Sequence, residues 1–455
     1  MDRPRYNPED IRGTDRGTKI DPAPEPSLPT PHSRVCPRII HKPKFISCSK
    51  IAARPSYPKC PQPYYGYGIS LRKLNPRPVK LSCTKENLHQ GLAVVSHLSA
   101  KNANLPILNN VLLRADVGGL RLTATNLDLT VTCQVRGKVD QPGEYTLPSR
   151  LFSDYVGLLP DERVDLDLLD TSLSVVCGAS KTKINGMSSG EFPLVPSITG
   201  GTKFMIPVSA LETALSRTLF AVATSEARQV LTGVFLNFAG ETKSLTVAAT
   251  DSYRLGESVV TLKGEVMGER RVIIPARTMA ELRRIIGVLR DSAEMPDELE
   301  VELTENQVAF RYGSAELLSR TLDGVYPPYK EIIPKTTKTE IVVNRTAFAQ
   351  AVRRTSLFSK AGLFDVRLEV KSGGKELQLS ATDAGRGENL VVMDAEVTGD
   401  DNVATLNYRY LLDGVSAMSS EKVVIKLIDA VNPCVVVPQE EAGQPYVYIV
   451  MPIRQ

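Results

Sequence analysis

From residue 79 onward, hydrophobic residues recur along this chain with two alternating periods. Apolar residues at three- and four-residue spacing, as in Leu88, Leu92, Val95 and Leu98, predict amphipathic helices. Segments in which apolar and polar residues alternate predict strands. The helical pattern occurs six times, over 84–101, 146–162, 209–226, 273–292, 345–362 and 405–421. The chain therefore repeats one order three times: strand, helix, several strands, helix, several strands.

A short phrase marks the same point in each repeat. Ala-Thr is followed by Asn126, then by Asp251 and then by Asp383, at intervals of 125 and 132 residues. An acid or amide that recurs beside a strand-ending Thr is typical of a structural turn rather than of a catalytic carboxylate. Thr84 and Ser209 are predicted N-caps of first helices in their repeats. Arg150, Arg277 and Arg409 occupy matching positions at the start of the second helices. A repeat of about 125 residues is large enough to be a domain, which predicts domain triplication.

Residues 1–78 have a different composition. They contain 15 of the 31 prolines and carry 15 Lys+Arg against 6 Asp+Glu, without helical or strand periodicity. This predicts a basic, Pro-rich, disordered extension. Regular periodicity starts abruptly at Val79, and a GUG start codon translated internally gives valine, so a native start near Val79 is one interpretation. A basic arm that touches DNA or a partner is the other, and an intact mass of the native protein would separate them.

Composition limits the class of function. The 455 residues are 42% hydrophobic and 23% charged, and no apolar run approaches the roughly 20 residues that span a membrane. Residues 79–455 carry 40 Lys+Arg against 45 Asp+Glu, so any affinity for DNA depends on where the charges lie. Seven scattered cysteines fit a reducing cytoplasm and give no metal motif. His89 and His97 are expected to be surface or packing residues of one helix rather than metal ligands.

The motifs of the sequence bear on two classes of function, an enzyme and a peptide-binding scaffold. An enzyme is disfavoured because no P-loop, zinc pattern or nucleophile elbow is present, so we expect no catalytic residues, no metal and no cofactor. A peptide-binding scaffold that does not bind DNA stays open.

From Val79 to Gln455 the chain resembles the bacterial sliding clamps, the beta subunits of DNA polymerase III. The most specific segments are "LPILNNVLL" (105–113), "LTVAATDSYRL" (245–255), "LDGVYPPYKEIIP" (322–334) and "YVYIVMPIR" (446–454). The resemblance implies an α+β fold of three tandem clamp domains, here 79–200, 201–334 and 335–455. Helices would line a central hole, with antiparallel sheets outside, and a head-to-tail homodimer would form the ring.

Simple geometry agrees with a ring of six domains. A domain of about 125 residues is about 35 Å across. Three such domains in contact leave a hole only about 5 Å wide, whereas six leave a hole of about one domain diameter, which accommodates duplex DNA. Three domains per chain therefore require two chains, and closed symmetry lets the head-to-tail contact repeat without free ends.

A clamp has to hold DNA and still slide, so contacts to phosphates are preferred over contacts to bases. We expect the basic residues of the helices to face the central hole, the lumen, and to contact DNA there. These lumen candidates are Lys101, Arg150, Arg217, Arg228, Arg277, Arg283, Arg284, Arg290, Arg353, Arg354, Lys360 and Arg409. The resemblance supports Arg150 directly. The alternative is that these are ordinary solvated helix faces.

The resemblance also implies a client-peptide pocket between the second and third domains. Its residues would be Leu231, Thr250, Ser252, Tyr253, Arg254, Leu255, Pro327, Ile332, Ile449, Met451 and Pro452. Leu, Ile, Met and Pro suit an apolar site, and Arg254 would offer directional hydrogen bonds at its rim. Glu331 stands where the family often has a basic residue, so the client motif could differ in charge. The alternative is that these residues only pack a domain junction.

Leu357 and Phe358 match apolar residues of the family's subunit interface, and domain-core packing is the alternative for them. The implied partners are duplex DNA, bound topologically and without sequence specificity, and a second copy of the chain. The replicative polymerase alpha subunit, the clamp loader and other proteins with a clamp-binding motif would be clients. No membrane is expected.

Overall fold

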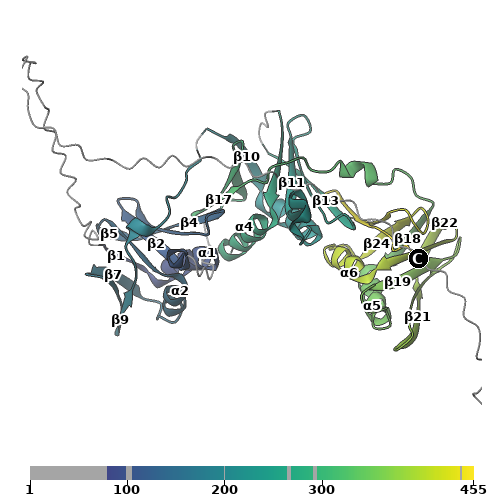
Figure 1. Cartoon of the computed structure of the whole chain (residues 1–455), viewed down its shortest axis with the longest axis horizontal. Coiled ribbons are helices and arrows are strands. Elements are labelled where there is room, and N and C mark those ends of the chain that lie inside the picture. The colour runs from purple at the N-terminus through teal and green to yellow at the C-terminus, as the bar shows by residue number, and fades with distance from the viewer. Residues whose placement is uncertain are drawn as a thin grey trace, which may run out of the picture. The chain divides into compact units, whose positions relative to one another are not determined.

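The computed structural model describes residues 79–98, 105–198, 200–263, 268–290, 295–440 and 443–454 (Figure 1). The predicted extension at residues 1–78 and the candidate Lys101 lie outside these ranges. Strands β1–β9, β10–β17 and β18–β26 form three successive domains, each with two α-helices, and their strands pair antiparallel. The predicted α+β fold with three tandem copies is confirmed.

The first domain begins with a strand, and Thr84 at the end of that strand caps its first helix, as predicted, because the Thr84 hydroxyl accepts a hydrogen bond from the Asn87 N–H at 3.2 Å. Its elements are β1 (Lys80–Thr84), α1 (Lys85–Val95), η1 (Ser96–Leu98), η2 (Pro106–Asn109), β2 (Asn110–Asp116), β3 (Gly119–Thr125), β4 (Leu129–Val135), β5 (Lys138–Gln141), β6 (Gly143–Pro148), α2 (Ser149–Gly157), β7 (Arg163–Leu169), β8 (Ser172–Cys177), β9 (Ser180–Asn185) and η3 (Ser189–Glu191).

The second domain repeats this order. Its elements are β10 (Thr202–Pro207), α3 (Val208–Thr218), η4 (Leu219–Ala221), η5 (Glu226–Thr232), β11 (Gly233–Ala239), β12 (Ser244–Thr250), β13 (Arg254–Thr261), β14 (Glu269–Pro275), α4 (Ala276–Leu289), β15 (Glu298–Leu303), β16 (Gln307–Tyr312), β17 (Ala315–Arg320) and η6 (Tyr329–Ile332). The predicted N-cap at Ser209 is wrong. Helix α3 already begins at Val208, after Pro207, because a proline is well suited to lead a chain into a helix, and Ser209 lies inside the first turn.

The third domain repeats the order again. Its elements are β18 (Thr339–Asn344), α5 (Arg345–Ser356), β19 (Asp365–Val370), β20 (Glu376–Asp383), β21 (Gly387–Asp394), β22 (Glu396–Gly399), β23 (Asn402–Asn407), α6 (Tyr408–Ser416), β24 (Lys422–Leu427), β25 (Cys434–Pro438) and β26 (Tyr446–Val450). In each domain the two α-helices pack side by side, as α1 does on α2, α3 on α4 and α5 on α6.

The sheets continue from one domain into the next. At the first junction β4 of the first domain pairs antiparallel with β17 of the second, with Leu129 opposite Ser319. At the second junction β13 of the second domain pairs with β26 of the third, with Arg254 opposite Val450. In both cases the last strand of one domain pairs with the fourth strand of the domain before it. Two sheets of eight and nine strands result, while β9 and β21 are terminal strands of the two remaining sheets.

Candidate functional site

The repeated phrase forms the same turn in all three domains. The Asn126 Oδ1 atom accepts hydrogen bonds from the N–H groups two and three residues later, at 3.1 and 2.9 Å. Asp251 Oδ1 accepts the corresponding pair at 2.9 and 2.9 Å, and Asp383 Oδ1 at 3.0 and 3.1 Å. The predicted structural turn is confirmed, because each of these side chains is occupied by its own backbone.

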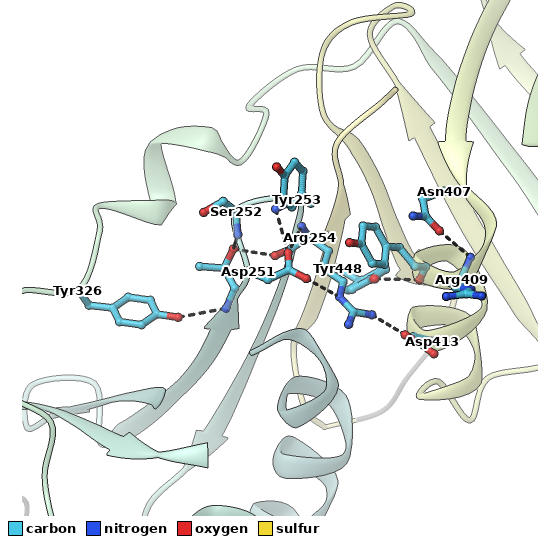
Figure 2. Close-up of polar contacts among 11 residues, drawn as sticks. Asp251, Ser252, Tyr253, Arg254, Tyr326, Asn407, Arg409, Asp413 and Tyr448 are labelled. Atoms are coloured by element: carbon cyan, nitrogen blue, oxygen red, sulfur yellow. Dashed lines mark hydrogen bonds and ion pairs between the residues drawn. The ribbon is translucent and has the colours of Figure 1, made fainter. Parts of the chain in front are cut away.

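The second copy of the turn has a left-handed residue and a tyrosine anchor. Ser252 has φ 78°, and its N–H donates to the Thr250 hydroxyl at 3.1 Å. That hydroxyl donates to the Arg254 carbonyl at 2.6 Å, while the Thr250 N–H donates to the Tyr326 hydroxyl at 3.1 Å (Figure 2). The turn is therefore fixed to the segment that leads out of the second domain.

A separate apolar cluster lies at the second junction. It contains Leu231 and Leu255 from the second domain and Ile449 from the third, all of which were predicted for the client pocket. Tyr326 and Tyr329 also belong to it, and the ring of Phe235 stacks on Tyr326 with centroids 4.9 Å apart. The structure thus brings residues from both domains into one apolar core, as a client site at a domain junction requires.

The remaining predicted residues surround this cluster. Tyr253 is 64% exposed, and its carbonyl accepts a hydrogen bond from the Met451 N–H at 2.8 Å, which ties the turn to the end of β26. Ile332 and Pro327 are exposed, and Met451 and Pro452 are half-buried. We call the exposed residues Tyr253, Pro327 and Ile332, with the cluster beneath them, the docking surface.

Arg254 lies in this region but does not have the predicted role. Its Nε donates to Asp251 Oδ2 at 3.0 Å, and its Nη1 pairs with Asp413 on α6 of the third domain (Figure 2). Its guanidinium also lies over the Tyr410 and Phe220 rings, 4.5 and 5.5 Å from their centroids. The prediction of hydrogen bonds offered at the rim is therefore corrected: Arg254 joins the two domains beneath the docking surface.

Arg228 places a guanidinium beside the turn. It was predicted for DNA binding, but its Nη1 donates to the Ser252 hydroxyl at 3.2 Å, and its side chain is exposed beside the turn. Arg228 lies only three residues before Leu231, and this proximity along the chain is a signal for its position.

The structure separates the other lumen candidates into two groups. The exposed ones are Arg150, Arg277, Arg283, Arg290, Arg353, Arg354, Lys360 and Arg409, of which Arg290 pairs with Glu212. The Arg409 guanidinium is held over the Phe364 ring at 3.7 Å, which limits its orientations.

Two predicted DNA contacts are corrected. Arg217 is only 3% exposed, because its guanidinium stacks on Tyr446 and donates to the Gln444 carbonyl at the second junction. Arg284 is half-buried at the first junction. Its Nη1 donates to the Ala93 carbonyl at 2.8 Å, and its Nη2 donates to Glu281 at 2.8 Å. Both arginines are thus occupied in joining domains.

Leu357 and Phe358 follow directly after α5. Leu357 is 68% exposed and Phe358 is half-buried. An exposed leucine at a helix end contributes little to the core of its own domain, so the alternative of core packing does not fit Leu357.

The described cysteines are free and buried. Burial raises the pKa of Cys83 and of Cys434 to about 12, and that of Cys133 to about 11, so these thiols are protonated at neutral pH. Among the residues that the structure describes, no group of three or more His, Cys, Asp or Glu side chains could hold a metal ion. In the same ranges no helix combines the length and the apolar character that a membrane span requires.

Comparison with known proteins matches every domain to one family. The N-terminal, central and C-terminal domains of the DNA polymerase III beta subunit match residues 79–196, 205–328 and 330–454. The chain belongs to the beta sliding clamp family. A beta sliding clamp from Synechocystis sp. is 33% identical over 400 residues, which covers 83% of this chain and 99% of the relative.

Solved sliding clamps share the fold. The Bacillus subtilis clamp is 27% identical and matches with a TM-score of 0.76, over 83% of this chain and 99% of that one. The Pseudomonas aeruginosa clamp bound to griselimycin is 26% identical, with a TM-score of 0.76 over 83% of this chain and all of that one. As a member of the beta sliding clamp family, this chain is a processivity factor on DNA and a non-catalytic subunit of the polymerase.

Proposed function

We propose that two copies of this chain close head to tail around duplex DNA, and that clients dock at the second junction while the ring slides. One observation carries this proposal: both junctions within the chain join the same two strands of the repeat. The third pair of equivalent strands is β21, the fourth strand of the last domain, and β9, the last strand of the first. Each is a terminal strand of its sheet. A second copy supplies the missing neighbour of each.

The repeat also gives the register of this contact. Thr125, Thr250 and Thr382 occupy equivalent positions, at or one residue before the end of their strands, and lie opposite Thr130, Leu255 and Glu388. Ser180 and Ala315 begin equivalent strands, β9 and β17, each after a two-residue turn. At the first junction Thr130 lies opposite Leu318, and the residue of β9 equivalent to Leu318 is Lys183.

The expected pairing therefore places Glu388 of one copy opposite Lys183 of the other. Opposite charges at facing positions stabilise an antiparallel pair. Leu357 follows the helix that packs against β20 and β21, which supports its assignment, with Phe358, to the subunit contact. Because each copy offers one β9 and one β21, two copies close without free ends.

Exposed arginines on the helices would hold the DNA. We assign phosphate contacts to Arg150, Arg277, Arg283, Arg353, Arg354 and Arg409, all of which are exposed. Contacts of this kind carry no sequence information and can be exchanged along the duplex, so the ring slides.

The docking surface would bind the short hydrophobic motif of the polymerase alpha subunit, the clamp loader and other clients. The apolar cluster of Leu231, Leu255 and Ile449 supports this proposal, and so does the exposed edge made by Tyr253 and Ile332. Arg228 is the cation at this edge, while Glu331 beside Ile332 is exposed and favours a client without an acidic residue at that end. We place the protein in the cytoplasm, where replication takes place, and the free, buried cysteines are compatible with a reducing compartment.

Retention on DNA tests the topological mode of binding. After loading, the protein is expected to stay on a closed circle and to leave the same DNA once it is linearised, because a ring slides off free ends. Equal retention on the circle and on the linear form would reject encirclement.

The subunit contact has its own test. The double variant Leu357→Asp, Phe358→Asp is expected to sediment as a monomer, because it buries two charges in an apolar contact. The matched variant Leu194→Asp, at an exposed leucine elsewhere in the chain, is expected to stay dimeric. A double variant that remains a dimer would remove the assignment.

A further inference from the structure

The second helix of every domain carries an acid at the same place. Counted from the first helical residue, the sixth residue is Asp154 in α2, Glu281 in α4 and Asp413 in α6. The second residue of each helix is one of the matching arginines, Arg150, Arg277 and Arg409. The acid therefore lies one turn beyond the arginine in all three helices.

At the first junction this acid binds a histidine from the preceding domain. Glu281 is buried, and its Oε2 lies 2.8 Å from the Nδ1 of His97, which follows α1. Its Oε1 accepts from Arg284 of its own helix, and Arg284 in turn reaches the Ala93 carbonyl of α1. The acid of the second domain is thus fixed to the end of the first helix of the first domain.

At the second junction the acid is used in the same way. Asp413 of the third domain pairs with Arg254 of the second (Figure 2). The Arg254 guanidinium lies over the ring of Phe220, which is the thirteenth residue counted from the start of α3, as His97 is from the start of α1. At both junctions, therefore, the partner of the acid lies at or beside this thirteenth residue.

The third acid has no such partner among the residues that the structure describes. Asp154 is 71% exposed at its side chain, and its contact is with Arg150 of its own helix, at 3.8 Å. The thirteenth residue from the start of α5 is Leu357, and the Leu357 carbonyl accepts a hydrogen bond from the exposed Arg386 Nη1 at 3.4 Å. A guanidinium therefore already lies beside this thirteenth residue, as the Arg254 guanidinium does at the second junction.

We propose that Asp154 of one copy binds the guanidinium of Arg386 of the second copy, at each of the two subunit junctions of the ring. The inference rests on the proposed head-to-tail dimer and names an ion pair that closes it. It gives the subunit junction a side-chain contact from the equivalent acid, as the two junctions within the chain have. The cation comes from the turn phrase, where Arg386 donates its own N–H to Asp383.

A charge-exchange experiment on the full-length dimer tests the pair. Asp154→Arg and Arg386→Asp are each expected to raise the dimer dissociation constant about 10- to 100-fold, since each places like charges together at both junctions. The double variant Asp154→Arg, Arg386→Asp is expected to return the constant to within about threefold of the original. Sedimentation velocity across a concentration series measures all four proteins.

The controls separate the possible failures. Glu305→Arg makes the same charge change at an exposed site of the second domain and is expected to leave the dimer unchanged. Single variants that dimerise like the original protein, or a double variant no better than the singles, would overturn the pair. Restoration by Asp154→Arg, Arg354→Asp instead would assign the acid to Arg354 and also overturn it. If the unmodified chain is a monomer at every concentration, the proposed dimer itself fails.

Discussion

The two junctions within the chain share the same strand pairing, but they differ in whether the chain covers the apolar residues beside it. At the first, Leu318 of β17 and Ala309 of β16 take the places that Ile449 of β26 and Val435 of β25 take at the second. Ile198 follows Phe192 by six residues at the first junction, and Ile332 follows Tyr326 by six residues at the second. Ile198 is 7% exposed and packs on Ala309 and Leu318, whereas Ile332 is 42% exposed.

This difference has a local cause. Tyr329 is buried in the second junction, and its hydroxyl donates to Glu257 Oε2 at 2.5 Å. Tyr329 also begins η6, whose turn carries Ile332 away from the cluster. The first junction has Val195 at the corresponding place, which has no hydroxyl to fix it and is exposed. The chain's own linker thus covers the apolar residues at one junction and leaves them accessible to a client at the other.

The rims differ in the same direction. Arg228 and Ser252 at the second junction correspond to Leu105 and Leu127 at the first, which are both exposed. A cation and a hydroxyl give a docking peptide directional hydrogen bonds, which two leucines cannot offer. Triplication therefore kept the architecture of both junctions, while recognition groups are found at one.

The largest expected effect is on the free energy of unfolding, and it distinguishes Ile198 from Ile332. Ile198→Asp places a charge among buried apolar residues and is expected to lower the free energy of unfolding by about 3 kcal/mol. Ile332→Asp changes an exposed residue and is expected to stay within about 0.5 kcal/mol. Denaturant unfolding followed by circular dichroism measures both. Similar losses for the two would mean that the linkers cover both junctions alike.

The same exposed isoleucine is expected to matter for clients. Ile332→Asp should weaken binding of a fluorescein-labelled clamp-binding peptide of the polymerase by about 2 kcal/mol, or about 30-fold, as loss of an apolar anchor does. Leu194→Asp, at the exposed linker of the first junction, is the matched control and should leave the affinity unchanged. Fluorescence anisotropy gives both values, and a loss of binding in the control would place the peptide elsewhere.

The polar ties at the two junctions are also expected to differ. Arg254→Met leaves Asp251 and Asp413 without their shared partner, and the side chain is largely buried, so a loss of about 2 kcal/mol is expected. His97→Ala removes a side chain that is mostly exposed, so its loss should stay below about 1 kcal/mol. Thermal unfolding of the two variants compares them, and an equal or larger loss for His97→Ala would reverse the ranking.

The smallest effect concerns the turns. Leu127 has φ 80°, a left-handed conformation that is unfavourable for a branched side chain, so Leu127→Gly is expected to stabilise the protein by about 1 kcal/mol. Ser252→Gly at the equivalent place should change stability by a similar or smaller amount, but it removes the hydroxyl that binds Arg228. Peptide affinity should therefore fall slightly for Ser252→Gly alone, and an equal fall for Leu127→Gly would contradict the assignment of the rim.

The repeat, the strand order and the turn acids could be predicted from the sequence because each leaves a local pattern. Periodicity predicted all six α-helices that the structure describes. Asn126, Asp251 and Asp383 are residue types that accept hydrogen bonds in turns, so the turns could be predicted as well. Helix ends were predicted less well. The pattern over 345–362 continues past Ser356, where α5 ends, since apolar residues after the helix pack as its last turn would.

The use of individual arginines could not be predicted. Arg217 and Arg284 lie on helices with basic neighbours, as Arg277 and Arg283 do, and only the adjacent domain decides which of them is covered. Arg254 sits inside the most specific segment of the chain, yet its partner Asp413 lies 159 residues away. Contacts between domains depend on residues that are far apart in the sequence, so local periodicity does not predict them.

The continuous sheets have a consequence for how the ring is entered. Strands β4 and β17 belong to one chain, and so do β13 and β26. The effective concentration of each strand for its partner is therefore about millimolar, so a pair that separates forms again rapidly. The proposed contact between β21 of one copy and β9 of the other has no such tether. The two subunit junctions of the proposed ring are therefore where it opens, and dilution separates them while the four junctions within the chains stay closed.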